Sequence, residues 1–226
     1  MSPFAVSPEC HALGLRAGAI LFEELRIGPA SRQLRDTIDA EAIRVRETFP
    51  SPGSIRSHPA IKRVHQILRS VGCHPRRHPP STEKLIQFAR RRETLPAINN
   101  LVDTYNLLSL QSFASLGAHD LDRIALPVRL ERFRRPEAFV PLGTDQPQSV
   151  AAGEFGYVDR AERVLCRLDS LQAEFSKVTA ATQRAILIIE ATDSLPPATL
   201  SDLLANTAVA IVHQCGGAVQ EIVGPN

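Results

Sequence analysis

The period of the apolar pattern changes about halfway along the chain, and this change restricts the possible folds more than any other feature. Before about residue 116, apolar residues recur mostly at helical spacing. After it, short apolar stretches are separated by glycine, proline and aspartate. Helices followed by strands are typical of α+β proteins, whereas α/β proteins alternate the two. We therefore expect an α+β fold in which helices cover a mostly antiparallel sheet.

One strand and four helices are predicted in the first half. The apolar stretch 18–27 is typical of a strand. The helices are predicted over residues 31–47, 59–71, 81–92 and 101–116. Ser31 and Ser81 are placed as the N-caps of the first and third helix. The prolines and the glycine of residues 49–53 predict a loop between the first two helices.

Short strands and one further helix are predicted in the second half. The strands are expected over residues 128–133, 138–142, 155–159, 164–168, 185–189 and 218–223. A helix introduced by residues 195–197 is expected to run to about His213 and to end before Gly216 and Gly217. Neither an internal repeat nor a low-complexity linker interrupts the chain. We therefore expect one domain over residues 1–226.

Basic residues are concentrated in one stretch. The segment from Arg56 to Arg92 holds ten lysines and arginines and one acid, Glu83, which gives a charge of +9. The remainder holds 16 basic and 23 acidic residues, a charge of −7. Such a concentration is typical of a surface that binds a polyanion, although a solvated helical face paired with distant acids is the alternative. Aromatic residues make up only 5%, so base stacking is not expected to dominate.

The sequence lacks the local motifs of several common enzyme classes. It has no GxxxxGK[ST], no GxGxxG after a strand, no GxSxG and no HExxH. Its four cysteines are widely spaced, and Cys73, His74 and His78 lack a second ligand pair at zinc spacing. We expect no disulfide framework, no metal and no cofactor. No apolar run approaches the ~20 residues of a membrane helix and no secretory signal is recognised, so a cytoplasmic protein is expected.

The segment between residues 95 and 124 carries the most specific signal. It contains Leu-Val-Asp-Thr-Tyr-Asn at 101–106 and Asp-Leu-Asp-Arg-Ile at 120–124. These motifs resemble the B3/B4 domain of the phenylalanyl-tRNA synthetase beta subunit, in which a Leu-Val-Asp-x-x-Asn helix precedes a similar turn. The likeness covers roughly residues 60–223. The chain as a whole resembles the free-standing B3/B4 proteins.

This resemblance implies that the chain acts on aminoacyl-tRNA. In the synthetase, the domain removes tyrosine that has been wrongly attached to the tRNA for phenylalanine. Asn106 falls on the family's active-site asparagine, and Glu190 falls on its editing-site glutamate. The family's histidine lies eleven residues after the asparagine, where this chain has Gly117, and His119 follows two residues later. Glu190, Asn106 and His119 are therefore the expected catalytic residues.

The remaining site residues form a pocket group and a tRNA-binding group. The expected pocket group is Gly117, Asp120, Thr179 and Thr182, with turn stabilisation as the alternative role for the last three. The expected tRNA-binding group is Arg76, Arg77, Arg90, Arg91, Arg92, Arg132, Arg134 and Arg135. For His119, a proton carrier near neutral pH and a cap on the turn after the long helix are both considered.

Three functions stay open on the sequence. The first is hydrolysis, in trans, of the ester of mischarged aminoacyl-tRNA, with the aminoacylated 3′ end as partner and neither DNA nor a membrane involved. The second is a non-catalytic RNA-binding accessory protein with the same fold. The third is a small-molecule esterase or amidase, or an amino-acid binder. The amino acid, the tRNA and the oligomeric state are left open.

Overall fold

Helices fill most of the first half of the chain. The computed structural model describes residues 2–225. Its helices are α1 (Pro8–Leu13), α2 (Arg32–Thr48), α3 (Pro52–Ser57), α4 (Pro59–Ser70), α5 (Ser81–Arg92), α6 (Asn100–Ser112), the short 3-10 helix η1 (Glu174–Ser176) and α7 (Pro197–Cys215). Among these described residues, no helix combines the length and the apolar character needed to cross a bilayer.

The strands form two main sheets and a separate small pair. They are β1 (Phe4–Val6), β2 (Leu15–Glu23), β3 (Ser115–Asp120), β4 (Val128–Arg132), β5 (Glu137–Phe139), β6 (Gln148–Val150), β7 (Phe155–Val158), β8 (Val164–Arg167), β9 (Leu171–Gln172), β10 (Ala185–Thr192) and β11 (Ala218–Val223). One sheet has the order β11-β2-β10-β3, the other β1-β4-β7-β8-β9, and β5 pairs with β6. All pairs are antiparallel except β1 with β4. This confirms the expected α+β fold with mostly antiparallel sheets.

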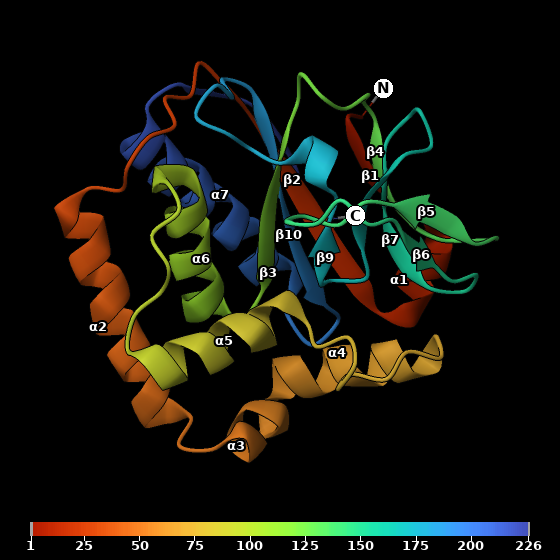
Figure 1. The fold of residues 1–226 in the computed structure, drawn as a ribbon, viewed down its shortest axis with the longest axis horizontal. Helices are drawn as coiled ribbons and strands as arrows, with labels where there is room; N and C mark the ends of the chain where they lie inside the picture. Colours follow the sequence, from red (N-terminus) through yellow and green to blue (C-terminus); the bar gives the residue numbers. More distant parts are fainter. Residues whose placement is uncertain (1, 226) are drawn as a thin grey trace.

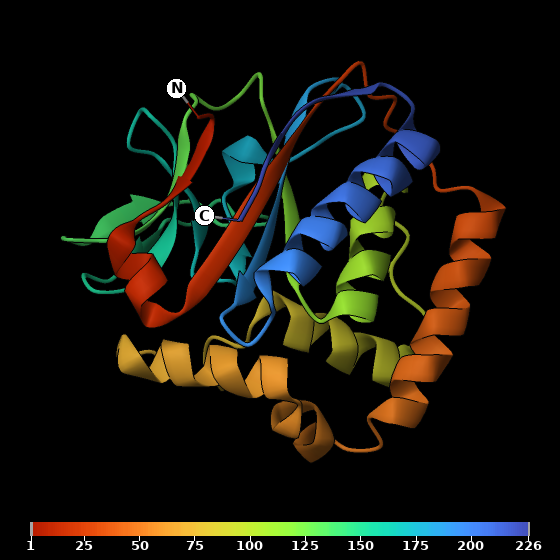
Figure 2. The same cartoon turned by 180° about the vertical axis from the view of Figure 1, so that it is seen from behind.

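The four-stranded sheet lies between two layers (Figures 1 and 2). Helices α6 and α7 cover one of its faces, and the five-stranded sheet lies against the other. Side chains of β10 alternate between these layers, as the period of two in a strand requires. Ile186 and Ile188 pack toward the five-stranded sheet, whereas Leu187 and Ile189 pack toward the helices. A third apolar cluster joins α2, α5 and α6, and α4 and α5 run along one end of the molecule (Figure 1).

Several local predictions are confirmed. Ser31 caps α2, because its Oγ accepts a hydrogen bond from the Leu34 N–H at 3.1 Å. The helix predicted over 59–71 is α4, and Gly72 follows it with φ of 80°, the left-handed conformation that favours glycine after a helix. The predicted strands 128–133, 155–159, 164–168 and 218–223 correspond to β4, β7, β8 and β11.

Other local predictions were wrong, and each error has a local cause. Part of the loop predicted at 49–53 belongs to α3, whose N-cap Ser51 forms a reciprocal capping box with Ser54. Ser81 does not cap α5; it is the first helical residue, and its hydroxyl bonds to Ser115 and Asp169 instead. The long helix ends early, because Phe113 adopts a left-handed conformation with φ of 59°. The residues after it pair with β10 as strand β3.

Candidate functional site

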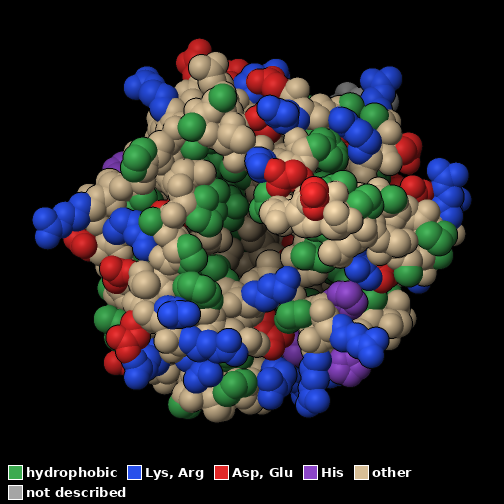
Figure 3. Space-filling view, in the orientation of Figure 1, with side chains coloured by type: hydrophobic (Ala, Val, Ile, Leu, Met, Phe, Trp, Pro, Cys, Tyr) green, Lys and Arg blue, Asp and Glu red, His purple; other side chains and the backbone are tan. Residues whose placement is uncertain are grey.

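Two cavities meet at the side chain of Glu190. One, of about 180 Å³, lies beside α4, and the other, of about 340 Å³, lies between α6, β3 and the strands β7 to β9. Ser115, Asp169 and Glu190 line both of them. The larger volume falls in the range of ligand-binding clefts, roughly 300–1,000 Å³. Figure 3 shows the hollow near the centre of the face, where Figure 1 draws β3 and β9.

The register of β3 against β10 brings the predicted catalytic strand residues to one face. Glu190 pairs with Ser115, Ile188 with Gly117, and Ile186 with His119. Directly paired residues of antiparallel strands point to the same side, so these positions all face the five-stranded sheet. Asn106 enters the larger cavity from α6. The structure therefore gathers Glu190, Asn106, His119 and Gly117 around one cavity.

Glu190 is a buried carboxyl group that is hydrogen-bonded, within the described residues, to one side chain. Its side chain is 6% exposed, and the Tyr157 hydroxyl donates a hydrogen bond to its Oε2. Burial raises the pKa of Glu190 well above its ordinary value, the nearby charge of Asp169 raises it further, and the Tyr157 hydrogen bond only partly offsets both. A carboxyl group perturbed in this way at a cavity wall is typical of a functional site.

Asp169 is the second buried carboxyl group and is held by hydroxyls. Ser115 Oγ donates to its Oδ2 at 2.5 Å, and Ser81 Oγ donates to its Oδ1 at 2.8 Å. Burial raises the pKa of Asp169 to about 6, although these hydrogen bonds and the charge of Lys84 lower it. Asp169 is therefore held in place by these hydroxyls, with its pKa raised above the ordinary value.

His119 is buried in β3 and held from the facing layer. Its Nδ1 lies 2.9 Å from Ser176 Oγ and 3.3 Å from Gln172 Nε2. Burial lowers the pKa of His119 to about 4. The imidazole is therefore neutral near pH 7, so the proposed proton carrier near neutral pH does not fit this environment. His119 also lies within a strand, so it does not cap the turn after the long helix.

The smaller cavity has a largely apolar wall. Ile61 and Val64 of α4 and Phe113 contribute to its lining. His58 packs against Phe113 with ring centroids 4.2 Å apart, and its Nδ1 is buried with no hydrogen-bond partner among the described residues. Burial lowers the pKa of His58.

Comparison with known proteins identifies the family. The B3/4 domain family matches residues 64–198, which is more than half of the chain. The chain belongs to the B3/4 domain family. No curated protein matches it.

A solved structure supports the fold over nearly the whole chain. It is an N-terminal fragment of the phenylalanyl-tRNA synthetase beta-subunit from Pyrococcus horikoshii, with a TM-score of 0.52 and 14% sequence identity. The likeness covers 96% of this chain and 49% of the fragment, so the chain spans about half of the fragment's length. At this identity the likeness shows a fold related to that of the synthetase.

Gly117 leaves an open position in the cavity wall of this B3/4 domain. A Cβ built on Gly117 meets no atom within 4 Å among the described residues, apart from its chain neighbours. Gly117 and His119 are two residues apart on one strand, so their side chains point to the same face. A histidine at position 119 therefore faces the same cavity as one at position 117 would.

Adding a methyl group is expected to have opposite consequences at two strand glycines. Gly117→Ala should change the free energy of unfolding by less than about 1 kcal/mol, because the space is empty. Gly156→Ala should lower it by roughly 1–3 kcal/mol, because the new Cβ would lie 2.3 Å from the Cys166 carbonyl oxygen. Urea unfolding of both variants measures the difference. Equal destabilisation would contradict the open position at residue 117.

Three residues of the predicted pocket group lie outside both cavities. Among the described residues, Asp120, Thr179 and Thr182 are absent from the walls of the two cavities that contain Glu190. Thr182 Oγ1 donates to Asp120 Oδ2 at 2.6 Å and accepts from the Thr179 N–H at 2.9 Å. Asp120 also accepts from the Asp122 N–H. Their hydrogen bonds join the turn after β3 to the loop before β10, so the turn-stabilising alternative describes them.

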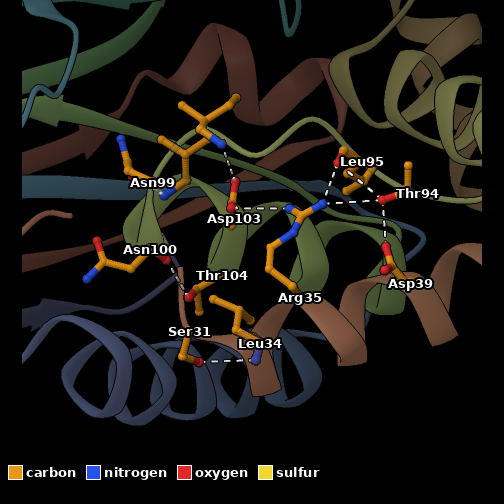
Figure 4. Close-up of polar contacts among 12 residues, drawn as sticks. Ser31, Leu34, Arg35, Asp39, Thr94, Leu95, Asn99, Asn100, Asp103 and Thr104 are labelled. Carbon is orange, nitrogen blue, oxygen red and sulfur yellow. Dashed lines mark hydrogen bonds and ion pairs between the residues drawn. The ribbon is translucent and has the colours of Figure 1, made fainter. Parts of the chain in front are cut away.

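The Leu-Val-Asp-x-x-Asn motif has a structural half and a cavity half, and Figure 4 shows the contacts of Asp103 in the structural half. Asp103 is 1% exposed, accepts from the Ile98 N–H at 3.0 Å and pairs with Arg35 at 3.2 Å. Arg35 also donates to the Leu95 carbonyl oxygen at 2.6 Å. This network ties the segment before α6 to α2. Asn106, one helical turn later, lines the larger cavity.

The two predicted tRNA-binding arginine groups differ in their surroundings. Figure 3 shows a band of lysine and arginine side chains below the hollow, over α4 and α5. Arg76, Arg77, Arg91 and Arg92 are exposed, and Arg90 is half-buried with Nη1 3.5 Å from the Pro50 carbonyl oxygen. In the second group, Arg134 and Arg135 pair with Glu9 and Glu137, and Arg132 donates to the Gly153 carbonyl oxygen. The first group is therefore the better candidate for an anion.

Three site residues were missed by the sequence analysis. Asp169, Tyr157 and Ser115 surround Glu190, yet none stands in a recognisable motif. Asp169 follows β8 in an Asp-Ser pair, which is ordinary turn composition. Tyr157 lies in an apolar strand and resembles a core residue. Only strand pairing, which brings Ser115 opposite Glu190, reveals this cluster.

Proposed function

We propose that this B3/4 domain chain hydrolyses, in trans, the ester bond of mischarged aminoacyl-tRNA. The observation that carries the proposal is the buried carboxyl group of Glu190 at the junction of two cavities, beside a second buried carboxyl group. A substrate that has a cationic group and a separate side chain fits this arrangement, with the cation beside the carboxyl groups and the side chain in one of the cavities. An aminoacyl ester carries both on one carbon atom.

Glu190 is proposed to bind the α-ammonium group of the aminoacyl ester. Burial currently disfavours its ionised form, and a cation beside it would supply the opposite charge and bring its pKa down again. The ammonium group would therefore bind with release of a proton from Glu190. Asp169, with its hydroxyl partners, is proposed to keep this region anionic when it ionises.

The two cavities then receive different parts of the substrate. The amino-acid side chain is proposed to lie in the smaller, largely apolar cavity. The ester and the attacking water are proposed to lie in the larger cavity, between Asn106 and His119. As a neutral imidazole, His119 orients groups by hydrogen bonding. An aminoacyl ester is already labile, so orientation can supply much of the acceleration.

The proposed partner is the aminoacylated 3′ end of a tRNA, with residues 1–226 acting as one domain. Arg76, Arg77, Arg90, Arg91 and Arg92 are proposed to contact its phosphates, and Arg132, Arg134 and Arg135 to add a second contact. Phosphate contacts position an RNA without reading its bases. The choice of amino acid is therefore proposed to rest on the smaller cavity.

A non-catalytic RNA-binding role is the second candidate. It is favoured by Gly117, which stands where the resemblance places the family's histidine and leaves the cavity wall open. In that case the basic surface would retain RNA while the cavities turn over no ester. Turnover and binding therefore have to be measured on the same protein.

Deacylation of a panel of charged tRNAs tests the proposal. The purified protein is incubated with correctly and incorrectly charged, radiolabelled tRNAs, beside the Glu190→Gln/Asn106→Ala double variant. We expect the wild-type protein to release label selectively from at least one mischarged tRNA. The double variant should no longer hydrolyse that tRNA but should still bind it. If the wild-type protein hydrolyses none of the charged tRNAs but still binds tRNA, the second candidate is favoured. Full activity of the double variant would remove both residues from the mechanism.

A further inference from the structure

A cavity with a strongly basic wall lies apart from the two cavities at Glu190. It measures about 500 Å³, and its lining includes Arg56, Arg69, Arg76 and His74, with the pair His65 and Glu83. A smaller cavity of about 340 Å³ shares Arg56, His65 and Arg69 with it and adds Lys62. Four cations and one carboxylate line the joined space, so its net charge is +3 with the histidines neutral.

Glu83, the one acid among the described residues of this wall, already has other hydrogen-bond partners. His65 Nε2 lies 2.7 Å from Glu83 Oε2, and both residues are buried. Gln87 Nε2 donates to the other carboxylate oxygen, Oε1, at 3.0 Å. Both oxygens of Glu83 therefore have partners other than the arginines, and its single negative charge leaves the wall with a net positive charge.

The arginines of the wall have no carboxylate partner within the described part of the chain. Across residues 2–225, no acid lies within ion-pair distance of Arg56, Arg69 or Arg76. All three side chains are exposed. Guanidinium groups gathered without counter-charges around one concave space raise the local concentration of anions, and their forked donors match phosphate oxygens.

The loop that carries Arg76 is held in a defined conformation. The His74 carbonyl oxygen accepts from the N–H groups of Arg77 at 2.9 Å and His78 at 3.1 Å. His74 Nδ1 accepts from the Arg76 N–H at 3.2 Å, so the proton of the neutral ring is on Nε2, which is left as a donor. Because the loop is folded before any ligand arrives, binding loses less conformational entropy.

Helices α4 and α5 separate this space from the smaller cavity at Glu190. Ile61, Val64 and Thr82 line that smaller cavity, whereas His65, Arg69 and Glu83, from the same two helices, line the basic one. The geometry points to a dedicated phosphate-binding site formed by Arg56, Lys62, Arg69, Arg76 and His74. Its ligand is a phosphate group, carried either by a nucleic-acid backbone or by a small phosphorylated compound.

Binding assays with two phosphate probes test this site without any ester chemistry, so the result is independent of the proposed hydrolysis. Uncharged tRNA is titrated by fluorescence anisotropy at several salt concentrations, and inorganic pyrophosphate is titrated by calorimetry. The variant is Arg56→Ala/Arg69→Ala/Arg76→Ala. Its matched control, Arg26→Ala/Arg123→Ala/Arg160→Ala, removes three exposed charges outside the basic cavities.

For a nucleic-acid ligand we expect the cavity variant to bind tRNA at least tenfold more weakly than the control variant. The slope of log affinity against log salt should also fall by roughly 2 to 3, as the loss of three phosphate contacts requires. For a small phosphorylated ligand, pyrophosphate binding should disappear in the cavity variant alone, with tRNA affinity matching the control. If the two variants bind both probes equally, or if the wild type binds neither, no phosphate site exists here. Circular dichroism verifies that both variants are folded.

Discussion

Glu190→Gln is expected to reduce the deacylation rate of the preferred mischarged tRNA by about 10- to 100-fold, the loss that corresponds to one hydrogen bond to a charged group. Glutamine keeps the shape of the side chain and can still accept the Tyr157 hydrogen bond. It cannot provide the negative charge that the proposal assigns to the bound state. Single-turnover hydrolysis with excess protein measures the effect separately from tRNA binding.

The same substitution is expected to leave folding intact or to strengthen it above about pH 5. In the folded protein the pKa of Glu190 is raised, so the folded state retains a proton that the unfolded chain has released. Wild-type stability therefore falls as pH rises above the ordinary value of 4.5, and the variant lacks this contribution. Thermal unfolding between pH 4 and pH 8 should show the variant gaining stability relative to the wild type.

Glu221→Gln is the matched control for Glu190→Gln. Glu221 also lies in a strand of the four-stranded sheet, but its side chain is exposed. Neither activity nor the pH dependence of unfolding should change in Glu221→Gln. A fully active Glu190→Gln protein would refute the proposed role, and a destabilised one would indicate that the carboxylate is a structural partner instead.

Asp159→Ala is expected to lower the free energy of unfolding by about 1–3 kcal/mol, the cost of leaving a buried hydrogen-bond donor without its partner. Asp159 is completely buried and pairs with Arg163. It also accepts from the backbone N–H groups of Ala125, Ala161 and Arg163 at 3.0–3.1 Å. The substitution leaves these donors without a partner. Urea denaturation at pH 7 measures the loss, with exposed Asp145→Ala as a control expected to change stability by less than about 0.5 kcal/mol.

This stabilisation should depend on pH in a defined direction. Burial alone would raise the pKa of Asp159, but hydrogen bonds from Arg163 and the backbone outweigh it and hold the pKa below its ordinary value of 3.8. The contribution is therefore complete above pH 3.8 and is lost as pH falls toward the lowered pKa. The gap between wild type and variant should be widest near neutral pH and narrow in acid. A gap independent of pH would show that the cavity left by the side chain, not its charge, is responsible.

Much of the fold could be predicted because it is determined by local patterns. The period of the apolar residues predicted α2, α4 and α7, and Ser31 was correctly placed as a cap. Strand β3 could not be predicted in this way, because Ser-Leu-Gly-Ala-His-Asp has little strand character of its own. It becomes a strand because the chain turns at Phe113 and the residues that follow form hydrogen bonds with the edge of β10. Long-range pairing decided its conformation against its local preference.

The candidate site could be predicted only where a motif marked a residue. Glu190 and Asn106 were placed by family resemblance, and both line the larger cavity. Asp169 comes from a short turn far along the chain, and its environment depends on hydroxyls contributed by α5 and β3. The raised pKa values likewise arise from burial in the folded protein. Such properties belong to the assembled site and leave no pattern in the sequence.

The position of the site residues within the sheet has an evolutionary consequence. Glu190 lies on β10, which has a neighbour on each side, whereas Gly117 and His119 lie on β3 at the sheet edge. A substitution on β3 changes the cavity wall while disturbing one strand pair, and a substitution on β10 disturbs two. Substitutions on β3 can therefore alter the side chains of the cavity wall while the carboxyl group of Glu190 on β10 is kept. The chemistry of this cavity wall can therefore change without a change of fold.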